Sequence, residues 1–426
     1  MSRHYENRGH EQAAHDAQFS NPVYDHSNYD NSPRTSSYKN TAEAVPLGTE
    51  AEDKELFDQI DQLRRCRVDE YIDLPQIAVV GDQSAGKSSV LEALTNIPFQ
   101  RSTIKCTRFA TQITLRRADD VKNTVTILPH KECHPDEKLR LEKFKQSFSD
   151  AADFHTIFAE AMKTIFPNSE HDSFLSKNIL SIEVSGPELP HLTVVDLPGL
   201  IHAAAGNIDI RDKEAIDSLA KSYMENERTI ILLVISCTTD IASQIGLTYV
   251  RRFDKEGVRS LGVITKPDTT TYSTAREKEF IDLAAGKDPK NVLRLGWHVL
   301  RNRAHGEDGF SPAEREATED DFFRSHKNWK DNLEPSQLGI REFRTKLSTQ
   351  LRRHIAAEAI KVQADIENEL EKSKEGLLRL GDDVDTPEEM RAKFSKCCGT
   401  SLRVTQAAVQ GHGNYYQGPL HHNFNY

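Results

Sequence analysis

A short apolar segment that runs into a glycine-rich loop is the feature that most constrains this chain. Residues 76–80, QIAVV, are followed directly by GDQSAGKSS, in which Gly81, Gly86, Lys87 and Ser88 satisfy the pattern G-x-x-x-x-G-K-[ST]. The pattern combines a buried strand, a turn that glycines allow, and a helix whose first N–H groups face an anion. It therefore predicts an α/β fold with a phosphate group at the start of a helix.

Two side chains of this loop have defined roles in that prediction. Lys87 would place its charge on the β- and γ-phosphates, and the Ser88 hydroxyl would be a ligand of Mg²⁺. The loop alone is also compatible with ATP binding, or with a phosphate loop that serves only structure. The phosphate-contacting residues that we expect are Gly81, Asp82, Gln83, Ser84, Ala85, Gly86, Lys87, Ser88 and Ser89.

A second motif favours guanine over adenine. Thr265, Lys266 and Asp268 form the pattern T-K-x-D directly after the apolar segment LGVI. The Asp268 carboxylate could accept two hydrogen bonds, from the ring N1–H and the exocyclic amine of guanine, and adenine offers no such pair. An isolated TKPD would also fit an ordinary turn. Its position after a strand, and its order relative to the loop, favour GTP over ATP.

Two further segments are candidates for the metal and the γ-phosphate. Asp196 begins DLPG after the strand LTVV, where its carboxylate could hold Mg²⁺ through water and the Gly199 N–H could contact the γ-phosphate. The alternative is a turn that ends a strand. Thr107, in IKCTRFAT, stands where a switch threonine would complete the Mg²⁺ shell, although it also fits the start of a strand. Asn302 and Arg303, after WHVLR, fit a fifth element that packs against the base.

The water-positioning group has to come from an unusual place. Small Ras-like GTPases have a glutamine directly after their D-x-x-G motif, whereas this chain has Leu200, which cannot orient water. Gln83 and Ser84 in the phosphate loop are the polar candidates. Their alternative interpretation is that they are solvent-facing loop residues.

The alternation of apolar and helical segments defines the fold class. Between Gln76 and Arg303 it predicts an α/β domain with a mixed, mostly parallel sheet between helices. Apolar residues at helical spacing precede this region at Leu56, Ile60 and Leu63, and a long helical register begins at Ile340. The strands that we expect are 77–80, 192–195, 229–235, 261–264 and 297–300, with 107–115 and 179–184 beside this core.

The flanks divide the chain further. Residues 1–48 have few aliphatic side chains, which predicts a disordered arm. The helical register stops near Gly381, and Thr386 with Glu389 forms a capping box for another helix. The expected division is a disordered arm (1–48), an N-terminal bundle helix (49–73), the nucleotide domain (74–335), an incomplete helical bundle and start of a stalk (336–410), and a tail (411–426).

Composition narrows the classes of partner and compartment. The 66 acidic and 55 basic residues give a net charge of −11, which argues against general affinity for nucleic acid. The longest apolar segment, residues 230–235, is far shorter than the roughly 20 residues of a membrane-spanning helix. The N-terminus lacks the apolar stretch of a secretory signal. We therefore expect a cytoplasmic protein without a transmembrane span.

Together, GDQSAGKSSVLEAL, CTRFAT, DLPGL and TKPD resemble the dynamin superfamily, especially its Mx-like and fungal members. The resemblance extends from about Leu56 to near Gln410. It implies a large GTPase that binds GTP with Mg²⁺ and releases GDP and phosphate. It also implies that Gln83 helps place the attacking water, and that Ser84 helps hold a monovalent cation, K⁺ or Na⁺, in place of an arginine finger.

The resemblance to the helical parts of that family is partial. Residues 56–63 are similar to the first bundle helix, residues 340–355 to the second, and Val362 onward to the start of the stalk. The third bundle helix and the effector region have no counterpart before Tyr426.

The resemblance also implies partners. These are a second GTPase domain, longer dynamin-like proteins, and family-level contact with microtubules or with organelle membranes, on which the chain would be peripheral in membrane remodelling or fission. The alternative is a truncated, nucleotide-dependent interaction protein that regulates longer relatives without efficient turnover.

Overall fold

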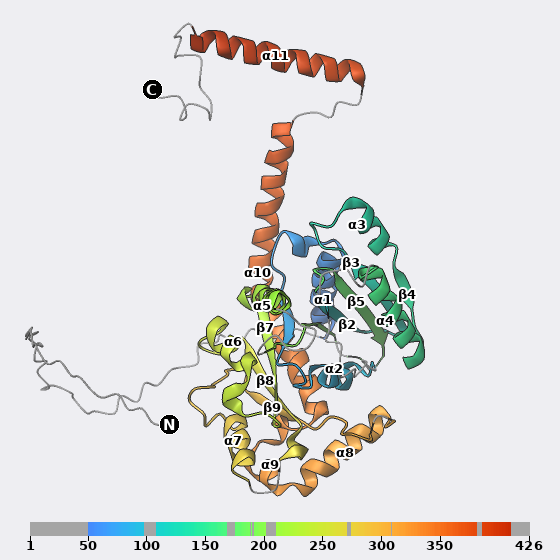
Figure 1. Cartoon of the computed structure of the whole chain (residues 1–426), viewed down its shortest axis with the longest axis vertical. Helices are drawn as coiled ribbons and strands as arrows, with labels where there is room; N and C mark the ends of the chain where they lie inside the picture. The colour runs from blue at the N-terminus through green and yellow to red at the C-terminus, as the bar shows by residue number, and fades with distance from the viewer. Residues whose placement is uncertain are drawn as a thin grey trace, which may run out of the picture. The chain divides into compact units, whose positions relative to one another are not determined.

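The computed structural model describes residues 50–97, 108–167, 175–187, 189, 191–201, 210–270, 274–307, 309–380 and 386–409. Within these ranges one nine-stranded sheet lies between helices, as Figure 1 shows. The expected arm 1–48, the tail 411–426 and Thr107 lie outside the described residues.

The sheet is mixed and mostly parallel, which confirms the predicted fold class. Its strand order is β4-β3-β5-β2-β6-β1-β7-β8-β9. The five strands from β6 to β9 are parallel to their neighbours, whereas β2 is antiparallel to β6, and β3 is antiparallel to both β4 and β5. The strands are β1 (Gln76–Val80), β2 (Thr111–Arg117), β3 (Lys122–Leu128), β4 (Lys145–Ser147), β5 (Ile179–Gly186), β6 (Leu192–Asp196), β7 (Thr229–Ser236), β8 (Ser260–Thr265) and β9 (Trp297–Leu300).

The helices cover both faces of the sheet because the central strands are apolar on both sides. Ile77 and Val79 of β1 face one apolar layer, and Ala78 and Val80 face the other. The first layer contains α1 (Glu50–Arg65), α2 (Lys87–Thr95), α4 (Ala151–Ile165) and the start of α10 (Ile340–Leu380). The second contains α5 (Ile210–Glu225), α6 (Ile245–Phe253), α7 (Ala275–Ala284), α8 (Pro312–Ser325) and α9 (Lys327–Asn332).

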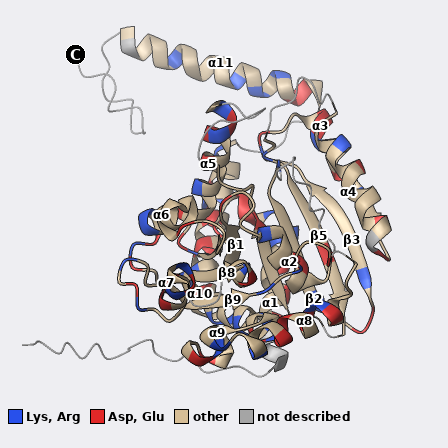
Figure 2. Cartoon of the chain, turned by 60° about the horizontal axis from the view of Figure 1, so that its bottom comes forward, with Lys and Arg blue, Asp and Glu red and all other residues tan. Residues whose placement is uncertain are grey.

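Basic and acidic side chains are interspersed along these helices and along the short α3 (Pro135–Glu142), as Figure 2 shows. No described helix is long and apolar enough to cross a membrane.

The long helix α10 packs against the sheet through its first half. One face buries Ile340, Phe343, Leu347, Leu351 and Ile355, at the spacing that the sequence predicted. Each large apolar side chain buried in this way contributes about 1.5–3 kcal/mol. The helix is therefore anchored on the nucleotide domain.

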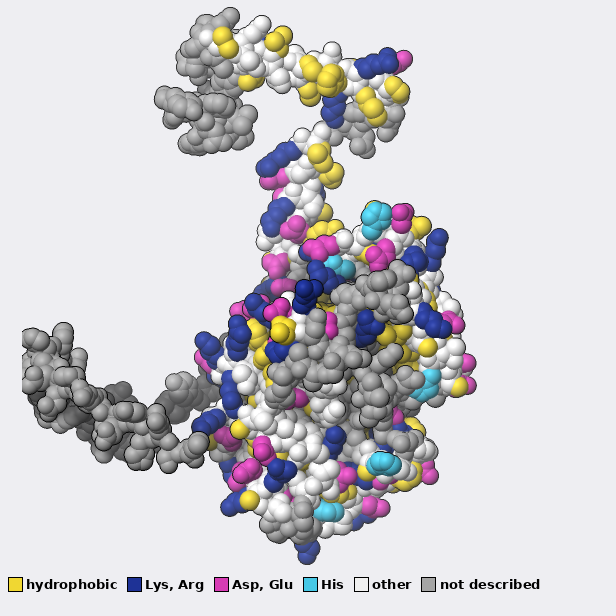
Figure 3. All heavy atoms as spheres, in the orientation of Figure 1, with side chains coloured by type: hydrophobic (Ala, Val, Ile, Leu, Met, Phe, Trp, Pro, Cys, Tyr) yellow, Lys and Arg dark blue, Asp and Glu magenta, His cyan; other side chains and the backbone are white. Residues whose placement is uncertain are grey.

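The end of α10 and the following helix expose apolar side chains. The register stops at Leu380, and α11 (Pro387–Val409) begins behind a capping box in which Thr386 and Glu389 bond each other's backbone N–H, as predicted. Leu378 of α10 and Phe394 of α11 are largely exposed. Hydrophobic side chains are visible along both segments in Figure 3.

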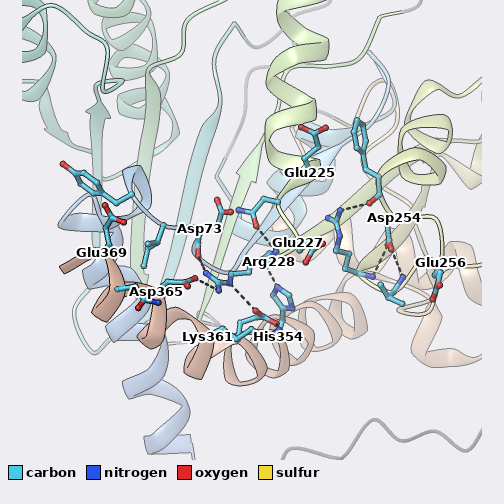
Figure 4. Close-up of a pocket in the computed structure, with 18 of the residues that line it drawn as sticks. Asp73, Glu225, Glu227, Arg228, Asp254, Glu256, His354, Lys361, Asp365 and Glu369 are labelled. Atoms are coloured by element: carbon cyan, nitrogen blue, oxygen red, sulfur yellow. Dashed lines mark hydrogen bonds and ion pairs between the residues drawn. The ribbon is translucent and has the colours of Figure 1, made fainter. Parts of the chain in front are cut away.

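A charged groove of about 1290 Å³ lies where α10 passes the amino-terminal ends of β1 and β7. Arg228 donates to the Asp73 carbonyl oxygen at 2.8 Å and to Asp365 Oδ2 at 2.7 Å, and its Nε lies 3.3 Å from Glu358 Oε2. The imidazole of His354 contacts the Arg228 carbonyl oxygen at 2.7 Å. Figure 4 shows these groups turned toward one another. Their contacts connect α10 to the amino-terminal ends of β1 and β7, and the phosphate loop lies at the opposite end of these strands.

Candidate functional site

The phosphate loop lies where β1 ends and α2 begins, and its backbone conformation explains its residue types. A Cβ on Gly81 would lie 2.3 Å from the Val234 carbonyl oxygen of the neighbouring strand β7, so only glycine fits there. Gly86 has φ of 99°, the left-handed region that favours glycine. Ser84 also has a positive φ, of 64°. The loop is thus folded tightly ahead of the first turn of α2.

Two hydrogen bonds hold this loop against the end of β8, and a third lies within the loop. The Thr265 hydroxyl donates to the Ala85 carbonyl oxygen at 2.5 Å and the Lys266 ammonium donates to the Ser84 carbonyl oxygen at 2.9 Å. Within the loop, Lys87 Nζ donates to the Gly81 carbonyl oxygen at 3.1 Å. The segments expected to bind phosphate and guanine are therefore adjacent, and Gln83 and Ser84 are exposed on the loop.

The DLPGL segment continues from β6 along the same loop. The Gln83 N–H donates to the Leu200 carbonyl oxygen at 2.8 Å, and the Leu200 N–H donates to the Gly81 carbonyl oxygen at 3.1 Å. A Cβ on Gly199 would lie 3.1 Å from Lys87 Nζ. Leu200 itself is buried, so its side chain faces the core. At Leu200 the segment therefore offers only backbone groups, and no polar side chain, to the expected γ-phosphate site.

Asp196, the last residue of β6, is a buried carboxylate with an unused oxygen. Its Oδ1 has no hydrogen-bond partner among the described residues. Burial raises the pKa of Asp196 to about 6, although the nearby Lys87 opposes that shift. A buried, unpartnered carboxylate oxygen beside the phosphate loop fits a Mg²⁺ ion held directly or through water. Ser88, in the first turn of α2, offers the hydroxyl that such a site also needs.

Asp268 lies on a single 3₁₀ turn (Pro267–Thr269) that directly follows Lys266, whose φ is 56°. Its side chain is partly exposed, and its Oδ2 lies 3.6 Å from Arg301 Nε. Asn302 Nδ2 is buried without a hydrogen-bond partner among the described residues. Arg303 instead forms an ion pair with Glu92 on α2 and donates to the Phe310 carbonyl oxygen. These contacts tie the fifth element to the phosphate-loop helix.

Two features of the site were not predicted from the sequence. The Asp82 carboxylate accepts hydrogen bonds from the N–H groups of Ile245 and Gly246 at 3.1 and 3.0 Å, so it supports the start of α6, and any phosphate contact would come from its backbone. Arg301 and Glu307 form a bidentate ion pair beside Asp268. The only signal for Arg301 was a charged residue placed directly before Asn302 at the end of an apolar strand.

Sequence comparison assigns the family. Residues 77–267 match the Dynamin family, and residues 286–422 match the Dynamin central region. This chain belongs to the dynamin superfamily. The first match covers the phosphate loop, Asp196 and part of the TKPD motif, and the second begins just after α7 and includes α10 and α11.

Mx proteins are among the relatives of this chain. The chain is 31% identical over 343 residues to the interferon-induced GTP-binding protein Mx1 of Otaria byronia, covering 79% of this chain and 49% of that protein. It is 30% identical to Mx of Solea senegalensis, covering 76% and 50%, and 31% identical to Mx2 of Sus scrofa, covering 70% and 40%. The chain thus spans about half the length of the curated relatives it matches.

Proposed function

We propose that this dynamin-superfamily chain binds GTP with Mg²⁺ and hydrolyses it to GDP and phosphate. The observation that carries the proposal is the convergence of three segments. The loop around Lys87, the strand end at Asp196 and the turn at Asp268 are joined by hydrogen bonds at the carboxyl-terminal ends of the parallel strands. The relatives named above are GTP-binding proteins by name, which supports the same proposal.

The phosphates would lie on the backbone of residues 81–89. N–H groups at the start of α2 and the Lys87 ammonium would neutralise the charge that develops on the β- and γ-phosphates. Ser88 and Asp196, together with Thr107, would hold Mg²⁺, which when bound would add positive charge at the phosphate oxygens. The Gly199 N–H would lie at the γ-phosphate.

Water would attack the γ-phosphorus in line and the bond to the β–γ bridging oxygen would break, so that GDP leaves. Gln83 would orient that water, since Leu200 is buried and has no polar group. Ser84, exposed beside Gln83, would help hold a monovalent cation, K⁺ or Na⁺. Asp268 would accept from the guanine ring, and Lys266, Thr265, Asn302 and Arg303 would line or support the base site.

A binding and turnover assay on the 426-residue chain tests the proposal. Phosphate release from GTP with Mg²⁺ should be clear, release from ATP should be weak, and Lys87→Ala should abolish tight nucleotide binding because the loop loses its cation. Equal turnover of ATP and GTP, or unchanged affinity in Lys87→Ala, would contradict it.

Pairing of two nucleotide domains across this face is a second part of the proposal, supported by family membership. Pairing would order the exposed Gln83 and Ser84 and accelerate hydrolysis. The specific rate of phosphate release should therefore rise with protein concentration and with K⁺ or Na⁺. A flat response to both titrations would remove dimerisation and the cation from the mechanism.

A nucleotide-dependent interaction protein is the second candidate. It is favoured by the exposed apolar side chains of α11 and the end of α10, which offer a surface to longer dynamin-like proteins. In that case the chain would be cytoplasmic, or peripheral on organelle membranes or microtubules. Co-sedimentation with a longer relative, with and without a GTP analogue, tests this; association independent of nucleotide would count against it.

A further inference from the structure

Arg301 is a buried cation beside the carboxylate expected to read guanine. It follows β9 directly, and only 9% of its side chain is exposed. Its Nε lies 3.6 Å from Asp268 Oδ2 and has no hydrogen-bond partner among the described residues. The Nε–H group is therefore the part of the guanidinium that is left to interact with Asp268.

The two terminal nitrogens of the guanidinium are held by a second carboxylate. Arg301 Nη1 and Nη2 donate to the two carboxylate oxygens of Glu307, each at 2.6 Å. Glu307 also accepts from the Ala304 N–H at 2.8 Å, and Glu319 accepts from the Arg301 backbone N–H at 2.8 Å. A bidentate pair fixes the plane of the guanidinium as well as its position. Arg301 consequently has one orientation, set by groups outside the base site.

Three carboxylates surround this one cation. Asp268, Glu307 and Glu319 all interact electrostatically with Arg301, and the pKa of Arg301 is raised by them against the opposing effect of burial. Removing the cation would leave Asp268 and Glu307 without the positive charge that both of them face, so their mutual repulsion would increase. The Asp268 carboxylate would then rotate away from the geometry that two parallel hydrogen bonds to guanine require.

We propose that Arg301, held by Glu307, is a positioning residue that sets the Asp268 carboxylate for guanine recognition. Arg301 does not itself contact the base; it acts through Asp268. The proposal rests on the proposed function, because it assumes that Asp268 accepts from the base. It adds a specificity determinant that the T-K-x-D pattern does not contain.

The discriminating measurement is the ratio of the inosine diphosphate and GDP dissociation constants. Inosine lacks the exocyclic amine, so this ratio reports the second hydrogen bond to Asp268. Arg301→Met should lower the ratio about 10-fold, the amount expected for one misaligned charged hydrogen bond. Arg301→Lys should recover part of it, since a charge without the planar fork remains. Glu307→Gln should give an intermediate ratio.

Arg228→Met is the matched control. Arg228 is also largely buried and pairs with two carboxylates, Glu358 and Asp365, but it lies at the opposite end of the strands. This variant should lose stability and keep the wild-type ratio. Thermal unfolding of every variant identifies those that fail to fold. If Arg301→Met fails to fold, the ratio measured for Glu307→Gln tests the inference instead.

The outcomes separate this inference from the proposed function. If Arg301→Met and Glu307→Gln weaken GDP and inosine diphosphate equally, the pair only supports the loop and the inference is wrong. If wild-type protein shows no preference for GDP over inosine diphosphate or ADP, the assignment of Asp268 fails first. A wild-type preference that falls in Arg301→Met, recovers in part in Arg301→Lys and is kept in Arg228→Met supports both.

Discussion

Thr265 Oγ1 donates a hydrogen bond to the Ala85 carbonyl oxygen at 2.5 Å, although the two residues are 180 positions apart. The same hydroxyl lies 3.0 Å from the Ile235 carbonyl oxygen on β7. Thr265 is fully buried. The strand that leads to the expected guanine site therefore fixes the phosphate loop through one side chain.

Replacing Thr265 by valine should loosen the loop. Valine keeps the shape but leaves the Ala85 carbonyl oxygen without this donor, which costs about 1–3 kcal/mol. GDP affinity should fall together with stability, as measured by urea unfolding and equilibrium binding. Thr193→Val is the control, because Thr193 is a buried threonine that donates to Asp61 Oδ1 far from the loop. Equal losses of GDP affinity in both variants would show that Thr265 has no special connection to the site.

Gly81→Ala should disrupt the loop by overlap with backbone. The added Cβ would lie 2.3 Å from the Val234 carbonyl oxygen, and the backbone of Val234 cannot move freely because it lies in the central strand β7. We expect a loss of about 3 kcal/mol in the free energy of unfolding, together with loss of nucleotide binding. Gly286→Ala provides the comparison, since no atom lies within 4 Å of the new Cβ and only its positive φ, of 69°, opposes the substitution. That variant should lose only about 1 kcal/mol.

Gln83→Ala should separate binding from hydrolysis. Gln83 is exposed, so its side chain contributes little to stability, and the backbone that would hold phosphate is unchanged. The rate of GTP hydrolysis should fall about 100-fold at unchanged GDP affinity and melting temperature. Wild-type turnover in this variant would mean that another group positions the water.

Glu319 gives a pH dependence with a defined sign. Burial raises its pKa from 4.5 to about 7, while it accepts from the N–H groups of Arg301 and Ile340. Between these values the unfolded chain has released a proton that the folded chain retains, so stability falls as pH rises toward 7 and is constant above it. The free energy of unfolding of wild type minus that of Glu319→Gln should fall by up to about 3 kcal/mol across this window. A difference that does not change with pH would refute the prediction.

The sequence predicted the parallel core well because those strands are buried on both faces. TIILLVIS of β7 is apolar almost throughout, and it is buried at every position. β3, KNTVTIL, and β4, KQS, were not predicted. They lie at the edge of the sheet, where β4 is exposed throughout and carries no apolar pattern.

The candidate site was likewise predicted only in part from the sequence. Motif spacing was enough to predict that Lys87, Asp196 and Asp268 lie at the same end of the sheet, because parallel strands have their carboxyl ends on the same side. It could not show that the Asp82 carboxylate turns to α6, nor that Arg301 faces Asp268. Those side-chain directions depend on tertiary contacts that no local pattern encodes.

Nucleotide preference in Asp268→Asn tests the central claim most directly, namely that a triphosphate beside Lys87 has its guanine read by Asp268. An asparagine amide can accept from N1–H and donate to an oxygen, so it suits xanthine, which has a carbonyl where guanine has an amine. Equilibrium binding should show GDP affinity falling about 100-fold and xanthosine diphosphate affinity rising in this variant, with ADP weak throughout. An unchanged preference for GDP would contradict the assignment.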